Sequence, residues 1–403
     1  MMKKIPLGKS VFNATEERIH WVFNTFPTVC LSFSGGKGSS VLLHLTADIA
    51  RRLKRKFTVL FIDWEVQYSD TIAHVSSMKT CYSDVIEKFY WVALPMTALN
   101  STSQHQPLWL PWDKTVEWVR CPPQDAITDE KFFPFYYYGM DCEEFVAKFG
   151  KWFANNASAA LLDGNRTEDS LNCYRTITSG RKMRFMDDKP WTTASKFGFC
   201  YYAYPIYDWK IKDIWLYYIR ENKPFNTVYE HMYKAGISPK NMHISEPYAG
   251  AQRQNLWLFA VVDATTWGKA SKRVKGASTG ALYGRKRSPF YAQKDFAKPT
   301  NLSWKEFALL LIKTLPPTTA EHYRNKIFLY LSGYQKKGFP NSIPEEQEYD
   351  LGLKDIPSWK RICSCILKND YWCRTLSFSP TKMSTYTTYS KRIKAKRDNW
   401  RLL

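Results

Sequence analysis

A short segment rich in glycine and serine, with one lysine, is the part of this sequence that most clearly points to chemistry. It reads SGGKGSS. Glycines allow positive φ and let the backbone come close to a ligand. Backbone N–H groups that begin a helix attract anions, and a lysine adds a cation. The segment therefore predicts a phosphate-binding site made by Ser34, Gly35, Gly36, Lys37, Gly38, Ser39 and Ser40.

The main alternative for this segment is a plain strand-to-helix turn that uses glycines only for its shape. A lysine inside the Gly/Ser run is not needed for such a turn, so the anion site is favoured. The segment is also distinct from the Walker loop, because the pattern G-x-x-x-x-G-K-[ST] is absent.

The elements around the segment must hold it at the edge of a sheet. The run TVCLSF before it is typical of a buried strand, and residues 41–53 after it repeat apolar side chains at helical spacing. Further strands are predicted at 57–65 and 89–95, with a helix at 68–82 between them. Strands that alternate with helices indicate a parallel sheet.

Asp63 ends the second predicted strand. Side chains at the carboxyl ends of strands line the ligand crevice of open α/β sheets, so we expect Asp63 to be a binding residue. The alternative is a carboxylate that caps a helix or faces solvent.

The later sequence returns to the same rhythm after a long insertion. Residues 96–140 are rich in proline and aromatic residues and predict little regular structure. A helix near 141–156 follows, then a strand, a turn and a helix over 157–175, and a helix at 212–221.

Length and pattern together predict the domain organisation. A chain of 403 residues has room for two or three domains at roughly 150 residues each. We expect a three-layer α/β domain with a mostly parallel, twisted sheet at 15–250. A basic, glycine-rich connecting segment at 251–300 and a basic, mainly helical region at 301–403 complete the prediction.

The charge is strongly positive. Lysine and arginine outnumber aspartate and glutamate by 58 to 37, a net charge of +21, which favours a polyanionic partner. Two segments, 264–294 and 391–403, hold 14 basic residues against one acidic residue. They predict contact with DNA or RNA; the alternatives are a flexible, solvated linker and a solvated helix. No apolar run reaches the ~18 residues of a membrane span, and no leader is evident, so we expect a cytoplasmic chain with no membrane partner.

Nine cysteines are present without a C-x-x-C pair, which is typical of reduced cytosolic thiols. The one cluster is Cys363, Cys365 and Cys373, which follows two basic residues. A reactive thiol and a metal site completed by His322 are the alternatives for this cluster. No His-based zinc motif occurs, so no metal-binding residue is predicted.

Three motifs resemble a known superfamily. SFSGGKGSSVLLHLTADI resembles the S-G-G-K-D-S loop of the PP-loop (N-type ATP pyrophosphatase) superfamily, in the branch of the phosphoadenosine phosphosulfate reductases and the small subunit of sulfate adenylyltransferase. GNRTEDS resembles the second motif of that branch, G-x-R-x-x-E-S, and the stretch that begins YPIYDWKIKDIWLYY resembles its third. The stretches EPYAGAQRQNLW and RVKGASTGALYG resemble the subgroup of YbdN and immunoglobulin-binding regulator A.

The resemblance implies a fold, a ligand and a reaction. The fold is that of the adenine nucleotide alpha hydrolase-like proteins, and the ligand is ATP or an adenylyl-sulfate-like nucleotide with Mg²⁺. The reaction cleaves the α–β bond and leaves AMP on an acceptor. Under this resemblance the catalytic residues are Lys37, Arg166 and Asp169, and Gly164 and Arg166 join the binding residues. Arg166 could hold a phosphate or sulfate with two hydrogen bonds, with a surface salt bridge as the alternative. Asp169 could serve with Glu168, or both could cap a helix.

This sequence departs from the superfamily pattern at three positions. Gly38 replaces the loop aspartate, Cys173 replaces the arginine of the second motif, and Asp169 replaces its glutamate. The changes affect catalysis more than binding, because the backbone donors and Lys37 remain. One alternative is therefore a nucleotide-binding regulatory protein that acts on nucleic acid or with a DNA-binding partner. A sulfonucleotide reductase is a further alternative, but the cysteine motif of those enzymes is absent.

Overall fold

The computed structural model describes residues 8–178, 183–186, 189–195, 198–244, 246–250, 252, 255–283, 298–336, 342–347 and 356–378. The chain divides into two compact units. The first unit comprises 1–96, 111–247 and 258–268, and the second comprises 97–110, 248–257 and 269–403. Each unit is therefore built from separate stretches of the chain. The sequence instead predicted consecutive regions with boundaries at 250 and 300, and those boundaries stay a prediction.

The first unit is built on a six-stranded sheet. Its order is β3 (Ile86–Val92), β2 (Phe57–Ile62), β1 (Thr28–Ser32), β6 (Ala159–Asp163), β8 (Cys200–Ala203) and β7 (Thr192–Ala194). All neighbouring pairs are parallel except β7 with β8. The predicted α/β class and mostly parallel sheet are confirmed. β1, β2 and β6 are largely buried apolar runs because both faces of the sheet are covered.

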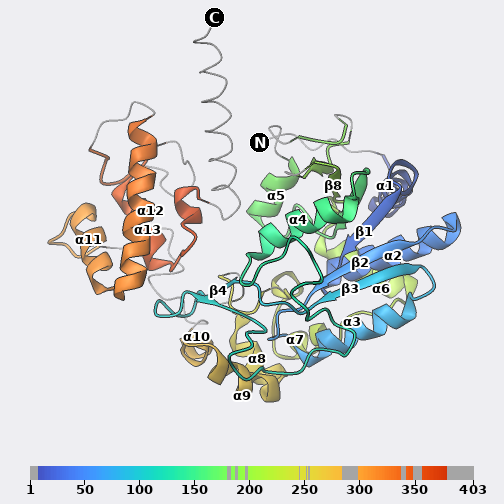
Figure 1. Ribbon diagram of the computed structural model, residues 1–403, viewed down its shortest axis with the longest axis horizontal. Coiled ribbons are helices and arrows are strands. Elements are labelled where there is room, and N and C mark those ends of the chain that lie inside the picture. The colour runs from blue at the N-terminus through green and yellow to red at the C-terminus, as the bar shows by residue number, and fades with distance from the viewer. Residues whose placement is uncertain are drawn as a thin grey trace, which may run out of the picture. The chain divides into compact units, whose positions relative to one another are not determined.

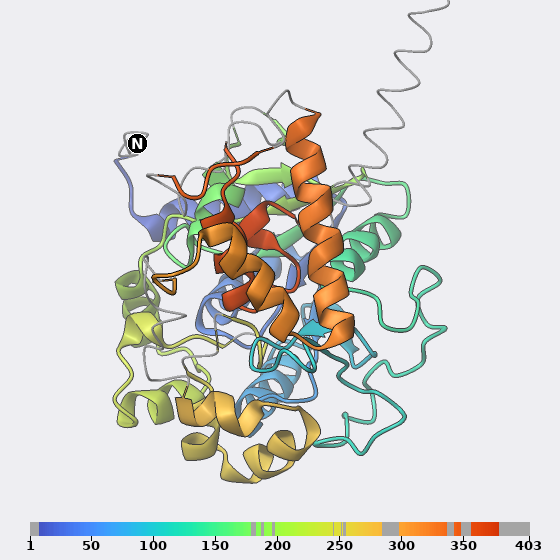
Figure 2. The ribbon, with the colours of Figure 1, turned by 90° about the vertical axis from the view of Figure 1, so that its left-hand side faces the viewer.

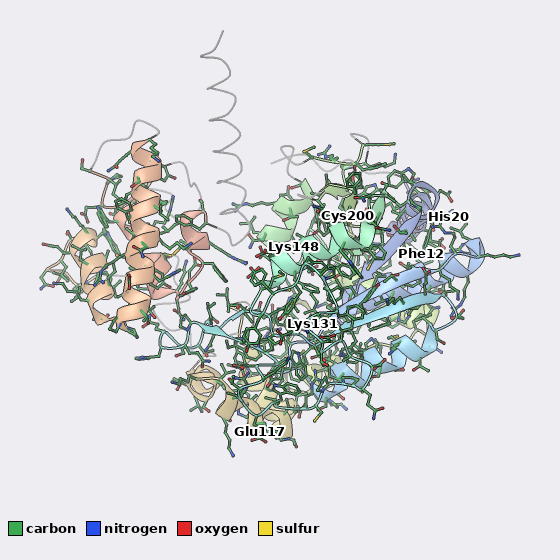
Figure 3. All side chains as sticks on the ribbon, viewed as in Figure 1. Phe12, His20, Glu117, Lys131, Lys148 and Cys200 are labelled. Carbon is green, nitrogen blue, oxygen red and sulfur yellow. The ribbon has the colours of Figure 1, made fainter. Side chains whose placement is uncertain are left out.

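Helices cover the two faces of this sheet, as Figure 1 shows. On one face α1 (Val11–Thr25), α2 (Lys37–Leu53), α3 (Ser69–Cys81) and α6 (Ile211–Glu221) pack on Leu31, Val59 and Leu162. On the other, α4 (Cys142–Ala154) packs on Cys30, Leu60 and Leu161. Neighbouring strand residues therefore point to opposite faces, as strand geometry requires. Figure 3 labels Phe12 on α1, in the helical layer on one face of the sheet, and Lys148 on α4, on the other face. It also labels Cys200 on β8, within the sheet.

The connections are as irregular as the sequence predicts. Within 96–140 only β4 (Ala98–Leu99) and β5 (Leu108–Trp109) form strands, paired as a small hairpin. This hairpin belongs to the second unit, where Trp109 packs edge-on against Tyr248 at 5.2 Å between ring centroids. After β6, the first unit continues through α5 (Leu171–Thr178) to α6, then α7 (Val228–Lys234) and the 3-10 turn η1 (Pro239–Asn241).

The connecting segment differs from the glycine-rich loop or linker expected from its composition. Residues 257–283 form three helices: α8 (Trp257–Val262), α9 (Ala264–Arg273) and α10 (Ala277–Tyr283). Small apolar residues form the buried face of this segment at helical spacing: Ala270, Val274, Ala277 and Ala281. The many glycines in the sequence made this helical pattern hard to recognise. The rest of the predicted basic segment, 284–297, lies outside the described residues.

The C-terminal region is helical, as predicted. It contains α11 (Trp304–Thr314), α12 (Pro317–Gln335), α13 (Trp359–Leu367) and the 3-10 turn η3 (Arg374–Leu376). Figure 2 shows α12, in orange, as the long helix of this group. The predicted basic tail 391–403 is outside the described residues. No helix in the described ranges is long and apolar enough to span a membrane.

Candidate phosphate-binding site

The Gly/Ser segment forms the connection from β1 to the first turn of α2, where the sequence predicted it. Gly35 has φ +70°, a conformation that favours glycine, and Gly36 is the residue before the helix. The hydroxyls of Ser34 and Ser39 lie 2.9 Å apart. Ser40 Oγ lies 2.9 Å from His74 Nε2. The loop therefore directs the open end of a helix toward the carboxyl edge of the sheet.

Lys37 begins α2 and is buried, with 5% of its surface exposed. Its ammonium donates to the carbonyl of Met242 and lies 5.5 Å from the ring centre of Tyr229. Its backbone N–H donates to the Tyr229 hydroxyl at 2.9 Å, and its carbonyl accepts from the Tyr218 hydroxyl at 2.8 Å. Burial, with Arg166 nearby, lowers the pKa of Lys37 to about 8. Lys37 is therefore a cation that loses its proton more readily than an exposed lysine.

The second motif lies against the loop. β6 is in register with β1, so that Asp163 lies beside Ser32. A Cβ atom at Gly164 would lie only 2.9 Å from the backbone nitrogen of Ser39. Gly164 is thus the residue that allows the two backbones to approach.

Arg166 and Asp169 form an ion pair within the second motif. Arg166 is buried, and its guanidinium lies 2.5 Å from Asp169 Oδ1, while its backbone N–H donates to Asp169 Oδ2 at 2.9 Å. Both residues influence the pKa of Lys37. The three residues predicted to be catalytic therefore share one electrostatic neighbourhood. Glu168 lies 3.6 Å from the Arg166 guanidinium, and its carboxylate also accepts the backbone N–H of Ile211 at 2.7 Å, which caps α6.

Asp63 lies just beyond the end of β2, and its carboxylate is buried. It accepts hydrogen bonds from Trp91 Nε1 at 2.8 Å and from the Glu65 N–H at 3.0 Å, and it forms an ion pair with Arg120. These contacts give Asp63 a structural role at the sheet edge. Its binding of a nucleotide stays a prediction.

Five residues near the loop were not identified from the sequence. Asn226 donates to the Gly35 carbonyl at 3.0 Å. Tyr218, Tyr229 and Met242 contact Lys37. The pKa of His243 is lowered mainly by burial and further by the charge of Lys37. Tyr218, Asn226 and Tyr229 lie within the stretch that resembles the third motif, but nothing in the sequence there indicates that they contact the loop.

Asp163 is a further carboxyl group that the sequence analysis missed. Burial raises its pKa to about 6, and Asp169 adds to the effect. Its two oxygens accept from the backbone and side chain of Asn165, at 3.0 and 2.9 Å. It stands beside the loop that lacks the superfamily's aspartate.

The described residues do not supply an evident protein cage for Mg²⁺. Within those ranges no group of three or more histidine, cysteine, aspartate or glutamate side chains is placed to hold a metal. The carboxylate of Asp169 is already paired with Arg166.

Tyr229→Phe tests whether the tyrosine hydroxyl covers a phosphate donor. The variant keeps the ring beneath Lys37 but frees the Lys37 N–H. Because one hydrogen bond contributes about 0.5–1.5 kcal/mol, we expect magnesium ATP to bind about 2- to 12-fold more tightly, measured by calorimetric titration. Tyr233→Phe, exposed on the same helix, is the control and should bind as the wild type does. Weaker binding by Tyr229→Phe would mean that the hydroxyl contacts the nucleotide instead.

Comparison with known proteins gives matches along the whole chain. Residues 28–109 match the phosphoadenosine phosphosulfate reductase domain family, and residues 236–351 and 341–387 match a domain of unknown function, DUF3440. The protein YbdN of Escherichia coli (strain K12) is 52% identical over 400 residues, which cover 99% of this chain and 98% of that protein.

Two solved structures align with part of the chain. The phosphoadenylyl-sulfate reductase of Candida auris, a phosphate complex, aligns with 57% of this chain and 94% of its own at 12% identity and a TM-score of 0.31. The FMN adenylyltransferase of Candida glabrata, in complex with ATP, aligns with 57% of this chain and 63% of its own at 13% identity and a TM-score of 0.33.

Proposed function

The chain belongs to the phosphoadenosine phosphosulfate reductase-like branch of the PP-loop superfamily, in one family with YbdN, and from this we propose that it binds ATP at Ser34–Ser40 and transfers its adenylyl group. An acceptor oxygen attacks the α-phosphorus, the bond between the α-phosphorus and the bridging oxygen breaks, and pyrophosphate leaves. The observation that carries the proposal is the convergence of Lys37, Arg166 and Asp169 at the open end of α2. A helix N-terminus with two nearby cations suits the charge of a leaving pyrophosphate.

One observation favours a second function, in which nucleotide is bound but turned over weakly. A Cβ atom at Gly38 would lie 3.1 Å from the Gly164 carbonyl oxygen, closer than an ordinary van der Waals contact. The packing of the loop therefore leaves little room for the Cβ atom that the superfamily's aspartate would bring. This supports a regulatory protein that uses ATP binding as a signal, acting on nucleic acid or with a DNA-binding partner.

Pyrophosphate release from magnesium ATP separates the two functions. We expect release by the wild type with sulfate, DNA or RNA offered in turn as acceptor. Calorimetric binding without release under any of these conditions would instead support the regulatory function. A chain that neither binds nor cleaves ATP would contradict both.

Substitutions at Gly38 test the missing carboxylate. Gly38→Ala and Gly38→Asp place the same Cβ atom near Gly164, so both carry the steric cost. If a carboxylate at this position assists pyrophosphate release, Gly38→Asp should be faster than Gly38→Ala. Equal rates in the two variants would show that the loop aspartate is not needed in this protein.

Nucleic-acid binding through the basic segments belongs to the second function. Lys269, Lys272 and Lys275 are exposed along and just beyond α9, which supports contact with phosphates. Arg273 is engaged internally, because it donates to the Leu110 carbonyl at 2.6 Å. The salt dependence of DNA affinity would measure how many of the lysines take part.

A further inference from the structure

The cysteine cluster of the C-terminal region separates into a single thiol and a pair. Cys363, Cys365 and Cys373 are all fully buried in the core of α11, α12 and α13. The Cys363 thiol donates to the Trp304 carbonyl at 3.3 Å. The Cys365 thiol instead donates to the Asp370 carbonyl at 3.7 Å, and the thiols of Cys365 and Cys373 each shift the pKa of the other. Cys365 and Cys373 are therefore close neighbours, although eight positions separate them in the sequence.

A tight backbone turn brings this pair together. After α13 ends at Leu367, the Asp370 N–H donates to the Cys365 carbonyl at 3.0 Å, and the Cys373 N–H donates to the Asp370 carbonyl at 2.8 Å. Cys373 itself has φ +52°, a left-handed conformation that is uncommon for a residue with a side chain. The turn thus holds Cys373 in an unfavourable backbone conformation next to Cys365.

His322 of α12 completes the cluster. Its ring stacks on Tyr371 at 3.8 Å between centroids and 4° between planes, and Nε2 lies 2.7 Å from the Tyr371 carbonyl. The Cys373 thiol donates to the same carbonyl at 3.7 Å, and the ring lowers the pKa of that thiol. A fixed imidazole beside a thiol is the arrangement that promotes thiolate formation.

The surroundings distinguish the two thiols. The neighbouring Cys365, followed by His322, lowers the pKa of Cys373 to about 7, although burial and Asp370 oppose the shift. Burial raises the pKa of Cys365 well above its usual value, with Cys373 and Asp370 adding to the effect and Lys368 opposing it. One sulfur is thus suited to attack and the other to retain its proton until a second step.

We propose that Cys365 and Cys373 form a peroxide-oxidisable dithiol that closes to an intramolecular disulfide. The Cys373 thiolate attacks one peroxide oxygen, the O–O bond breaks, and the hydroxide that leaves takes a proton and departs as water. Cys365 sulfur then attacks the Cys373 sulfenic acid, the S–O bond breaks, and the second hydroxide leaves as water with the Cys365 proton. Two thiols and one peroxide give one disulfide and two waters. The proposal does not depend on nucleotide binding.

Peptide mapping of the reduced full-length chain tests the proposal. The protein is treated with one equivalent of hydrogen peroxide and then denatured. Its remaining thiols are alkylated, the chain is digested, and the peptide masses are measured by mass spectrometry. We expect the Cys365 and Cys373 peptides to be linked and lighter by two hydrogens, while the exposed Cys81 and Cys121 are still alkylated. The oxidation rate should rise with pH through a midpoint of about 7. A reduced Cys365–Cys373 pair in a sample where Cys81 or Cys121 is oxidised would overturn the proposal.

Three variants separate chemistry from folding. Cys365→Ser should stop the reaction at a Cys373 sulfenic acid that dimedone traps, and His322→Gln should move the midpoint of the rate to higher pH. Cys363→Ser is the matched control, since Cys363 is equally buried but outside the pair, and it should form the same disulfide. Oxidation of Cys363 as fast as Cys373 in the wild type would also overturn the proposal. The wild-type map decides the matter even if a variant fails to fold.

Discussion

Lys37→Ala is expected to weaken the binding of magnesium ATP by about 10- to 150-fold, because a charge-assisted hydrogen bond contributes about 1.5–3 kcal/mol. The lysine is buried at the first turn of α2, and among the described residues its ammonium contacts a carbonyl and an aromatic ring. A triphosphate would offer it a stronger partner. Calorimetric titration of the two proteins at pH 7 measures the change.

The same lysine predicts a pH dependence with a defined sign. Burial lowers the pKa of Lys37 to about 8, so the ammonium is present below this value and is lost above it. A bound phosphate favours the ammonium and would raise its pKa. ATP affinity should therefore fall as pH rises through about 8, with proton uptake on binding in the alkaline range.

The control for both measurements is Lys151→Ala. Lys151 is exposed near the end of α4, so its removal should leave affinity and pH profile unchanged. The pH dependence between 7 and about 9 should disappear in Lys37→Ala. Equal affinities in Lys37→Ala and the wild type would remove the Gly/Ser loop from the proposed function.

The strands and the loop were predictable because their signals are local. β1, β2 and β6 are short apolar runs, and the glycines and lysine follow β1 directly. Arg166 and Asp169 were identified because they lie within one motif, although their pairing with each other was not predicted. Such features depend on neighbours in the sequence, where composition and spacing are visible.

The partners of Lys37 were not predictable in this way. Tyr229 and Met242 lie 192 and 205 positions away in the sequence, and their own surroundings carry no phosphate-binding pattern. Their place depends on how α6 and α7 return to the sheet edge, which is a property of the tertiary packing. The sequence placed Cys363, Cys365 and Cys373 in one cluster, but it could not show which two lie together, because that depends on the turn after α13.

Composition was misleading for the segment that contains α9 and α10. Its glycines predicted a loop, but Gly280 lies inside a helix, where a Cβ atom would come within 2.7 Å of Thr102 Cγ2. The glycine therefore serves close packing within the second unit. A glycine that makes room and a glycine that makes a turn are identical in a sequence.

Gly164→Ala should show how strongly the site depends on such a close approach. The added Cβ atom would lie 2.9 Å from Ser39 N, 3.0 Å from Ser39 Cα and 3.2 Å from Gly38 C. All three atoms belong to the backbone at the first turn of α2, so no flexible side chain can move aside. We expect the free energy of unfolding to fall by about 1–3 kcal/mol, as for other overpacked interiors, measured by denaturant titration.

The same substitution should weaken ATP binding, because relief of the clash displaces the Ser39 N–H and with it the donors at the open end of α2. Gly268→Ala is the matched control: a Cβ atom there meets nothing within 4 Å, and α9 should tolerate alanine well. Binding is compared at a temperature where both variants are fully folded, so a loss seen only in Gly164→Ala reports on the loop and not on unfolding. If the two variants match in stability and in affinity, the contact between the second motif and the loop does not set the geometry of the site, and the phosphate donors must be sought elsewhere along the sheet edge.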